Sequence, residues 1–471
     1  LKSVFEDQTA LLRNPAATLD RLRSLGVNTI RLYMAWGSLA PSATSKRAPG
    51  GSPATSPAAY PASGWAPYDA LDRGAPPGTP NAGADWKPAA PAFGAFVRAV
   101  ATRYSGSYAP PGASSPLPRV DQWSIWNEPN YGPQLAPQAI DNSTVEVSPA
   151  LYRELVNAAW SALQDTGHSR DTILIGELAP RGITGARYPG NFSGMVPLRF
   201  LRALYCVDSS LHELQGAAAT ARGCPATAAA SQSFARDNPG LFEASGVALH
   251  PYPQGALAPN FVTPGEPDYA DLAALPKVES VLDQITASYG SHHQLPIYST
   301  EFGYNTDPPY KLGAPMAKAA EYLNWSEYIS WHDPRVRSFD QYLLIDPPAD
   351  SHSRFDTGLE FAGSTPKPIY DAWRMPLYLP LSSGPRGVPL EVWGCVRPIA
   401  HVSAPAAGPA LIQFKPTSGG GFKTVKAVKL NRRDCYFDVP LDFPSSGTVR
   451  VSWSAPGLGR LVSRQAPISL S

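Results

Sequence analysis

Two glutamates stand where a short apolar stretch of the chain stops. Glu128 follows the run Val-Asp-Gln-Trp-Ser-Ile-Trp-Asn at 120–127, and Pro129 after it cannot continue a strand. Glu301 follows the run Leu-Pro-Ile-Tyr-Ser-Thr at 295–300, and Gly303 then permits a sharp turn. Because α/β barrels carry their chemistry at the carboxyl ends of their strands, the two runs predict a pair of carboxylates facing one cleft.

A carboxylate pair is what glycoside hydrolysis requires. One carboxylic acid protonates the leaving oxygen, and the other carboxylate attacks or stabilises the anomeric carbon. Two alternatives stay open at this point. Each glutamate is also compatible with an ordinary solvated strand end, and Glu177, which ends the apolar run at 172–176, competes for a role in the site. Glu177 has no asparagine before it, so we prefer the pair of Glu128 and Glu301.

The motifs Trp-Asn-Glu-Pro-Asn at 126–130 and Thr-Glu-Phe-Gly at 300–303 resemble those of glycoside hydrolase clan A, the retaining (β/α)8-barrel enzymes. Within the clan the chain is most similar to families 39 and 5. The resemblance extends over residues 1–375 as an ordered series of strand ends. It implies that Glu128 ends strand 4 and is the acid/base, and that Glu301 ends strand 7 and is the nucleophile.

The same resemblance implies roles for residues near other strand ends. Arg31, near the end of the run at 27–33, would lie beneath the nucleophile and keep it ionised. Tyr252 would donate a hydrogen bond to the nucleophile, and His250 would line the sugar pocket. Two alternatives remain: Arg31 is an interior arginine paired with another acid, or His250 is a core histidine whose hydrogen bonds are satisfied.

Further substrate contacts are expected from four side chains. Asn127 would bond the sugar 2-hydroxyl, a contact that strengthens in the transition state. Gln341, near the end of strand 8, is a further candidate. Trp36 and Trp126 are candidate stacking surfaces for sugar rings, and the alternative for both is an ordinary place in the core. We expect no metal ligands and no cofactor.

The rest of the chain alternates helix and strand patterns as an α/β barrel does. Apolar stripes predict helices at 91–104, 148–163, 276–289 and 317–331, and apolar runs predict strands at 1–5, 27–33, 172–177, 247–253 and 336–345. Residues 40–92 contain no apolar strand, although a helix is predicted to start over 65–72. Either the third unit is irregular or a segment is missing from this sequence, so the count of eight strands is in doubt.

Beyond residue 380 the pattern changes to short alternating runs separated by Gly, Pro and Ser. The runs at 390–396, 410–414, 423–430 and 448–453 predict a small antiparallel β-sandwich. We therefore expect a catalytic barrel over residues 1–378 and a sandwich domain over 379–471, the latter bracing the barrel.

Cysteine use and composition narrow the class of protein. Cys206 and Cys224 lie 18 apart in one loop-like region, and Cys395 and Cys435 lie in the sandwich region. No Cys-x-x-Cys spacing occurs, so two disulfides are favoured over a metal site, with four free thiols as the alternative. Disulfides predict an extracellular, secreted protein. The net charge of +1, with 16% charged residues, gives no basic surface for nucleic acid, and no apolar run is long enough to span a membrane.

The predicted function is therefore a secreted retaining glycosidase that acts on a carbohydrate with a β-type linkage. A transglycosylase would share every residue named above, and a non-catalytic carbohydrate-binding or cell-surface protein is the third possibility. The sugar, the choice between exo and endo action, and the oligomeric state are not readable from the sequence.

Overall fold

The structure is a computed structural model that describes residues 1–40, 54–72, 87–140, 143–183, 193–351, 355–402, 408–430 and 434–471. The predicted irregular interval at 40–92 therefore lies partly outside the described residues. Within it, α4 (Ala62–Asp72) confirms the helix predicted over 65–72.

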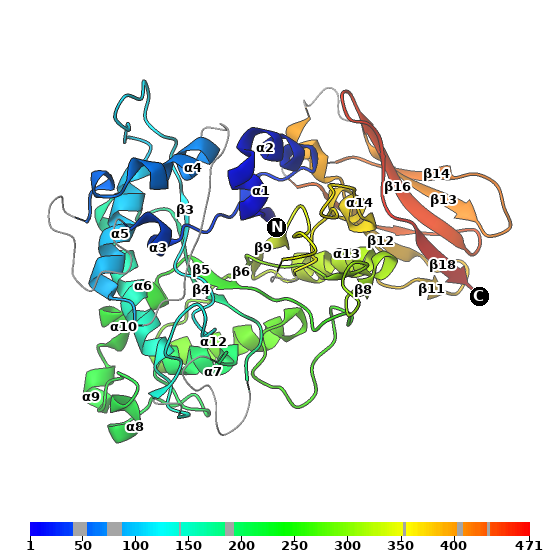
Figure 1. Ribbon diagram of the computed structural model, residues 1–471. Helices are drawn as coiled ribbons and strands as arrows, with labels where there is room; N and C mark the ends of the chain where they lie inside the picture. Colours follow the sequence, from blue (N-terminus) through cyan, green and yellow to red (C-terminus); the bar gives the residue numbers. More distant parts are fainter. Residues whose placement is uncertain are drawn as a thin grey trace.

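A seven-stranded parallel sheet forms the centre of the molecule (Figure 1). Its order is β2-β1-β9-β6-β5-β4-β3, so the first and last strands of the barrel region pair with each other, with Phe5 opposite Gln341. The strands are β1 (Lys2–Glu6), β2 (Thr29–Ile30), β3 (Gln122–Ser124), β4 (Thr172–Leu178), β5 (Gly246–Leu249), β6 (Ile297–Ser299) and β9 (Val336–Tyr342).

The sheet order is that of an α/β barrel with one strand missing. Reading along the chain, each strand pairs with the next one except at β2 and β3, and no strand lies between these two in the described residues. The prediction of an α/β barrel is confirmed, with seven strands in place of eight among these residues. The gap coincides with the interval at 40–92, in which no apolar strand was predicted.

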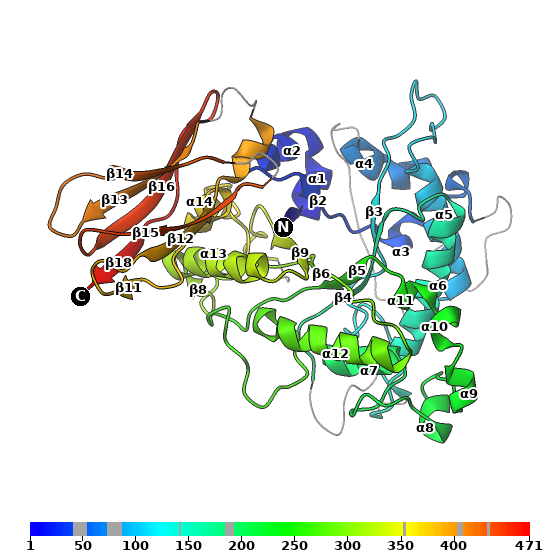
Figure 2. The same cartoon turned by 180° about the vertical axis from the view of Figure 1, so that it is seen from behind.

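Helices pack around the outside of this sheet (Figure 2). α6 illustrates the cause: Pro149 fits the first turn, and Tyr152, Leu155, Val156 and Leu163 make a buried stripe toward the sheet. The other helices are α1 (Gln8–Arg13), α2 (Pro15–Ser24), α3 (Trp36–Leu39), α5 (Ala90–Arg103), α6 (Ser148–Asp165), α7 (Pro197–Leu204), α8 (Gly216–Thr220), α9 (Ala228–Ser231), α10 (Phe234–Asp237), α11 (Pro239–Phe242), α12 (Leu275–Ser288), α13 (Met316–His332) and α14 (Pro368–Arg374). No helix in the described part of the chain is both long enough and apolar enough to cross a bilayer.

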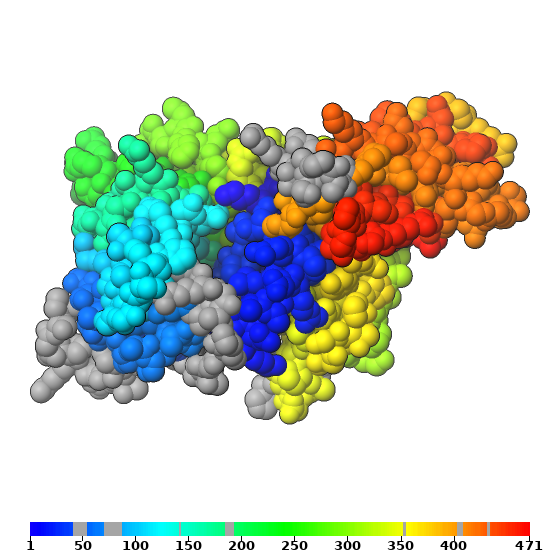
Figure 3. Space-filling view, turned by 90° about the horizontal axis from the view of Figure 1, so that it is seen from above, coloured from blue at the N-terminus to red at the C-terminus, as the bar shows by residue number. Residues whose placement is uncertain are grey.

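The C-terminal strands form a separate lobe at one side of the barrel region (Figure 3). Two sheets make it, with orders β10-β12-β15 and β11-β18-β16-β13-β14, and β17 pairs with β16. All pairings are antiparallel except β11 with β18. The strands are β10 (Leu377–Tyr378), β11 (Ser383–Gly384), β12 (Leu390–Cys395), β13 (Ala410–Pro416), β14 (Lys423–Val428), β15 (Tyr436–Leu441), β16 (Gly447–Ala455), β17 (Gly459–Val462) and β18 (Ala466–Leu470); β7 (Thr306–Asp307) and β8 (Ala314–Pro315) form a small ribbon in the barrel region.

Each lobe has its own apolar core. One cluster of buried side chains extends from Phe5 to Trp373, and a second extends from Met375 to Ile468. The predicted domain boundary at residues 378 and 379 stays a prediction. Both predicted disulfides are present, Cys206–Cys224 and Cys395–Cys435.

Candidate active site

Unusual backbone conformations place Glu128 at the carboxyl end of the sheet, after β3. Trp126 has φ of 70° and Glu128 has φ of 41°, in the left-handed region that costs a non-glycine residue about 1–3 kcal/mol. The N–H of Glu128 donates to the carbonyl of Glu177 at 2.9 Å, which holds the bend against the neighbouring strand. The Glu128 side chain is 20% exposed, so it is held by the sheet and still open to solvent.

Glu301 lies near Glu128 at the carboxyl end of the same sheet, after β6. It directly follows Thr300, whose N–H donates to the carbonyl of Leu249 at 3.1 Å and so continues the β5–β6 pairing. The Glu301 side chain is 12% exposed. One oxygen of Glu128, one oxygen of Glu301 and one ring nitrogen of His250 all lie within 4.8 Å of one another. The structure thus brings together the two glutamates that the sequence paired.

Arg31 is the positive centre beneath these carboxylates. Its Nη1 donates to Glu301 Oε1 at 2.6 Å and also bonds Glu6, and its Nη2 donates to Asn127 Oδ1 at 2.8 Å and pairs with Glu177 at 3.1 Å. Burial opposes the charge, but the three carboxylates outweigh it and raise the pKa of Arg31 well above its usual value. Because the carbonyl oxygen of Asn127 is occupied, its amide N–H groups are left to donate to a ligand.

His250 and Tyr252 complete the surroundings of the two glutamates. The Tyr252 hydroxyl donates to Glu301 Oε2 at 3.1 Å. His250 Nδ1 lies 3.0 Å from Glu128 Oε1 and 3.5 Å from Glu301 Oε2, and its Nε2 lies 2.7 Å from Glu177 Oε2. Burial opposes protonation, but the charges of Glu301, Glu128 and Glu177 raise the pKa of His250 from 6.5 to about 10.

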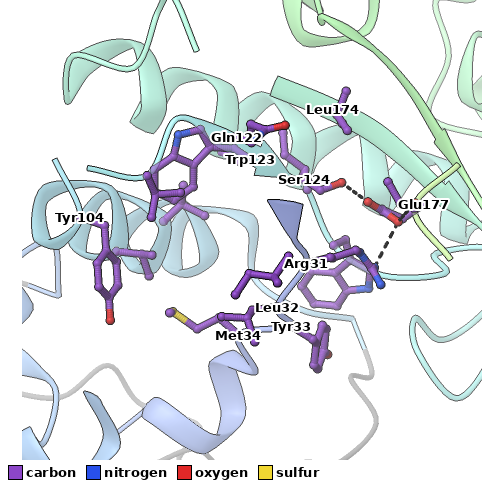
Figure 4. Close-up of a pocket in the computed structure, with 18 of the residues that line it drawn as sticks. Arg31, Leu32, Tyr33, Met34, Tyr104, Gln122, Trp123, Ser124, Leu174 and Glu177 are labelled. Carbon is purple, nitrogen blue, oxygen red and sulfur yellow. Dashed lines mark hydrogen bonds and ion pairs between the residues drawn. The ribbon is translucent and has the colours of Figure 1, made fainter. Parts of the chain in front are cut away.

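Glu177, the lower-ranked rival in the sequence, lies at the base of this group and not at its mouth. It is fully buried, and Figure 4 shows it between Ser124 and Arg31. Burial raises its pKa, but Arg31 and His250 outweigh burial and lower the pKa from 4.5 to about 2. Glu177 is therefore ionised and buried away from solvent. Its carboxylate binds Ser124, His250 and Arg31 and is not open to a substrate.

Two carboxyl groups of this centre were not predicted. Glu6 ends β1 and bonds Arg31, and burial, together with the charge of Glu301, raises its pKa from 4.5 to about 8. Asp340 of β9 is fully buried, and burial followed by the charge of Glu6 raises its pKa well above the usual value. Glu6 carries the same signal as the paired glutamates, an acid at the end of an apolar strand. Asp340 carries none, because only the register shows which face it occupies.

Three other predicted substrate contacts, Trp36, Trp126 and Gln341, pack against or bond to neighbouring protein groups. Trp36 packs on Phe93 and Phe96 at ring distances of 6.0 and 6.2 Å, and Trp126 meets Phe93 at 5.1 Å. Both tryptophans line a cavity of about 560 Å³, which is also bordered by residues of β2, β3 and α5. Gln341 is 1% exposed, and its Nε2 donates to the carbonyls of Tyr342, Leu343 and Thr357. The predicted roles of these residues as substrate contacts stay predictions.

The trio of Glu128, His250 and Glu301 also has the donor types of a divalent metal site. Both ring nitrogens of His250, however, face carboxylate oxygens at hydrogen-bond distance. A ring that donates from both nitrogens has no lone pair for a metal. The arrangement therefore fits acid–base and nucleophilic chemistry better than metal binding.

No protein-family model and no curated protein matches the chain. Among solved structures, it is similar to a family 39 glycoside hydrolase from Bacteroides cellulosilyticus WH2, with 15% identity, 94% of this chain and 79% of that chain covered, and a TM-score of 0.46. A glucosidase from Croceicoccus marinus matches at 11% identity over 94% of this chain and 93% of its own, with a TM-score of 0.47. A plant beta-glucan endohydrolase matches at 11% identity over 78% and 98%, with a TM-score of 0.36.

Proposed function

We propose that this protein is a retaining glycoside hydrolase that cleaves a β-type O-glycosidic bond by double displacement. The observation that carries the proposal is the meeting of Glu128 and Glu301 from opposite strands, with an oxygen of each within 4.8 Å of the other. Retaining enzymes place their two carboxyl groups about 5–5.5 Å apart, whereas inverting enzymes leave about 6.5–9.5 Å for a water molecule. The oxygen–oxygen distance within 4.8 Å is compatible with the shorter spacing of retaining enzymes, and the covalent route is the one that we propose.

Glu301 is the nucleophile in this proposal, because both of its carboxylate oxygens accept hydrogen bonds from fixed donors. Arg31 donates to one of its oxygens at 2.6 Å and Tyr252 donates to the other at 3.1 Å. Attack by Glu301 on the anomeric carbon forms a glycosyl ester and breaks the bond to the leaving oxygen. The two hydrogen bonds orient the carboxylate toward the sugar.

Glu128 is the acid/base in this proposal, because its side chain is the more exposed of the two, at 20% against 12% for Glu301. It gives its proton to the leaving oxygen in the first step and removes a proton from water in the second. His250, 3.0 Å from Glu128 Oε1, fixes the orientation of the carboxyl group. The free amide N–H of Asn127 would meet the sugar 2-hydroxyl.

A transglycosylase would use the same residues with a sugar as the acceptor in place of water. A non-catalytic sugar-binding protein needs no such carboxylate pair. Analysis of the products on a panel of β-glycans separates the three: free reducing ends indicate hydrolysis, lengthened chains indicate transfer, and unchanged glycans indicate binding alone. The two disulfides support a secreted protein. The partner in this proposal is a carbohydrate.

The direct test is Glu301→Gly. Removing the nucleophile should reduce turnover of aryl β-glycosides by about 10⁴-fold or more, since the covalent step is lost. Added azide, which fits the space of the missing carboxylate, should restore turnover and yield a glycosyl azide of inverted configuration. Glu154→Ala, on the exposed face of α6, is the control and should behave as wild type. Wild-type rates for Glu301→Gly would remove Glu301 as the nucleophile.

A further inference from the structure

The buried side chain of Glu177 has four polar partners in the barrel interior. Its Oε1 accepts a hydrogen bond from the Ser124 hydroxyl. Its Oε2 accepts from His250 Nε2 at 2.7 Å and from the Thr300 hydroxyl at 2.7 Å, and pairs with Arg31 at 3.1 Å. These four partners belong to or directly follow β3, β5, β6 and β2, so one carboxylate ties together four strands of the sheet.

The backbone around Glu177 is bent to bring the carboxylate inward. Gly176 has φ of 103° and Glu177 has φ of 50°, and the pairing of β4 with β5 shifts register between Gly176 and Leu178. A Cβ at position 176 would lie 2.7 Å from the Ala248 carbonyl oxygen, so only glycine fits there. Strained conformations of this kind persist where the surrounding contacts hold them, and they cluster at functional sites.

The two cations that Glu177 binds are the ones that touch the paired glutamates. Arg31 reaches Glu301 at 2.6 Å, and His250 reaches Glu128 at 3.0 Å and Glu301 at 3.5 Å. Glu177 itself is 0% exposed and touches neither of the paired glutamates through its side chain in any described contact. Its influence on them therefore passes through the two cations.

We propose that Glu177 is a positioning residue that fixes Arg31 and keeps the His250 ring protonated on both nitrogens, so that two fixed positive charges face Glu128 and Glu301. The catalytic part of this inference rests on the proposed function, whereas the protonation of His250 does not. An imidazolium donates from both nitrogens, which matches the carboxylate oxygens found on either side of the ring. A neutral ring would leave one nitrogen lone pair facing a carboxylate.

Charged and titratable groups on the neighbouring strands surround His250 and affect its protonation. Arg31 opposes a second positive charge, whereas the carboxylates favour it. The groups are Glu6 on β1, Arg31 after β2, Glu128 after β3, Glu177 on β4, Tyr252 after β5, Glu301 after β6, and Asp340 and Tyr342 on β9. Glu177 is the carboxylate closest to the ring, at 2.7 Å.

Nitrogen NMR of the histidine rings tests the inference in the whole protein. The chain has eight histidines, so the His250 signal is identified by its loss in His250→Asn. In the wild type both ring nitrogens of His250 should stay protonated up to about pH 8. In Glu177→Gln, which keeps the shape and removes the charge, the His250 titration midpoint should fall by at least about one pH unit, a tenfold loss of proton affinity.

Two further variants keep the test decisive. Glu327→Gln removes a fully buried carboxylate of another ion pair and should leave the His250 titration unchanged. Glu177→Asp retains the charge and should recover part of the shift. A His250 midpoint in Glu177→Gln equal to that of the wild type overturns the inference, and so does a singly protonated ring in the wild type at pH 7, a result that does not depend on Glu177→Gln.

Kinetics then separates positioning from mere support of the fold. In Glu177→Gln, kcat on an aryl β-glycoside should fall by about 100-fold with a smaller change in KM, because misplaced groups slow the chemical step. The alkaline limb of the kcat profile should move to lower pH together with the His250 midpoint. A wild-type protein inactive on every glycan would refute the proposed function and leave the NMR result standing. An active protein whose His250 ignores Glu177 would refute only this inference.

Discussion

Two buried arginines in this molecule are surrounded in opposite ways. Arg397 lies between the barrel and the C-terminal lobe, where its Nε donates to the Trp373 carbonyl at 2.9 Å and its Nη1 bonds Ser3. Its Nη2 lies 2.7 Å from both oxygens of Glu327, which also accepts a hydrogen bond from Tyr436 at 2.6 Å. One buried cation thus meets one buried anion, and each described polar atom of the pair has a partner.

The group around Arg31 is not balanced in this way. Arg31 and His250 together face five carboxyl groups: Glu6, Glu128, Glu177, Glu301 and Asp340. Neither oxygen of Asp340 has a hydrogen-bond partner among the described residues. Glu6 and Asp340 have raised pKa values chiefly because of burial, which favours the protonated form of both carboxyl groups. The balanced pair joins the two lobes, whereas the unbalanced group keeps five carboxyl groups beside two cations.

The largest loss of activity is expected from a substitution in the unbalanced group. Glu128→Ala should reduce hydrolysis of substrates with poor leaving groups by about 10²–10⁴-fold, because general acid catalysis is lost. Substrates with dinitrophenolate leaving groups need little protonation, so their first step should stay fast and the glycosyl-enzyme should accumulate. Burst kinetics measures the accumulation of the glycosyl-enzyme. Added azide should intercept this intermediate and give a glycosyl azide of retained configuration.

The control for Glu128→Ala is Glu154→Ala on the surface of α6, which should retain wild-type rates. An equal loss on good and poor leaving groups would contradict the role of Glu128 as the acid. Such a result would leave the carboxylate as a structural member of the unbalanced group.

The next effect is expected at the balanced pair and concerns stability. Glu327→Gln leaves Arg397 buried without a counter-charge, which costs about 3–5 kcal/mol of unfolding free energy when one partner of a buried pair is removed. Urea unfolding, monitored by tryptophan fluorescence, measures the change in unfolding free energy. At temperatures where the variant is folded, its activity should match that of the wild type, since the pair touches none of the paired glutamates.

Replacing both partners separates the two groups further. The double variant Glu327→Leu with Arg397→Met should recover much of the lost stability, because apolar side chains of similar size often replace a buried ion pair at little cost. A double variant less stable than Glu327→Gln would show that the pair contributes more than mutual neutralisation.

The sequence predicted much of this site because its signals are local. Glu128 and Glu301 each close an apolar run, and Arg31 closes another, so their arrival at one sheet edge follows from parallel pairing. Asp340 lies inside a strand, and only the pairing of Val4 with Asp340 shows that it faces the interior. The gap between β2 and β3 in the described residues coincides with the interval at 40–92, where no apolar strand was predicted.

The parts that the sequence did not predict depend on long-range contacts. The run at 120–127 predicted a long strand, but β3 ends at Ser124, and the residues after it bend through a left-handed conformation at Trp126. That bend is held by the Glu128 N–H bond to Glu177, a residue of another strand. The short strands β15, β17 and β18 lacked a clear apolar alternation, and pairing with β12 and β16 defines them.

A further effect is a dependence of stability on pH, to which the unbalanced group contributes two large shifts. The pKa of His250 rises on folding from 6.5 to about 10, because the charges of the neighbouring carboxylates outweigh burial. A raised folded pKa contributes stability that is fully present below pH 6.5 and is lost as the pH rises through 10. The pKa of Glu6 rises from 4.5 to about 8, chiefly because of burial, so its contribution has the same sign and is lost between pH 4.5 and 8.

Each of these protons changes the unfolding free energy by about 1.4 kcal/mol per pH unit within its window. Between pH 6.5 and 8 both windows overlap, so urea unfolding at a series of pH values should show the steepest loss of stability there. His250→Asn should flatten the curve above pH 8, whereas Glu327→Gln should lower it at every pH without changing its slope. Arg397 stays charged throughout this range, so the balanced pair has no reason to respond. Constant wild-type stability from pH 6.5 to 8 would mean that the unbalanced group holds no extra protons, and the distinction between the two arginine sites would then rest on geometry alone.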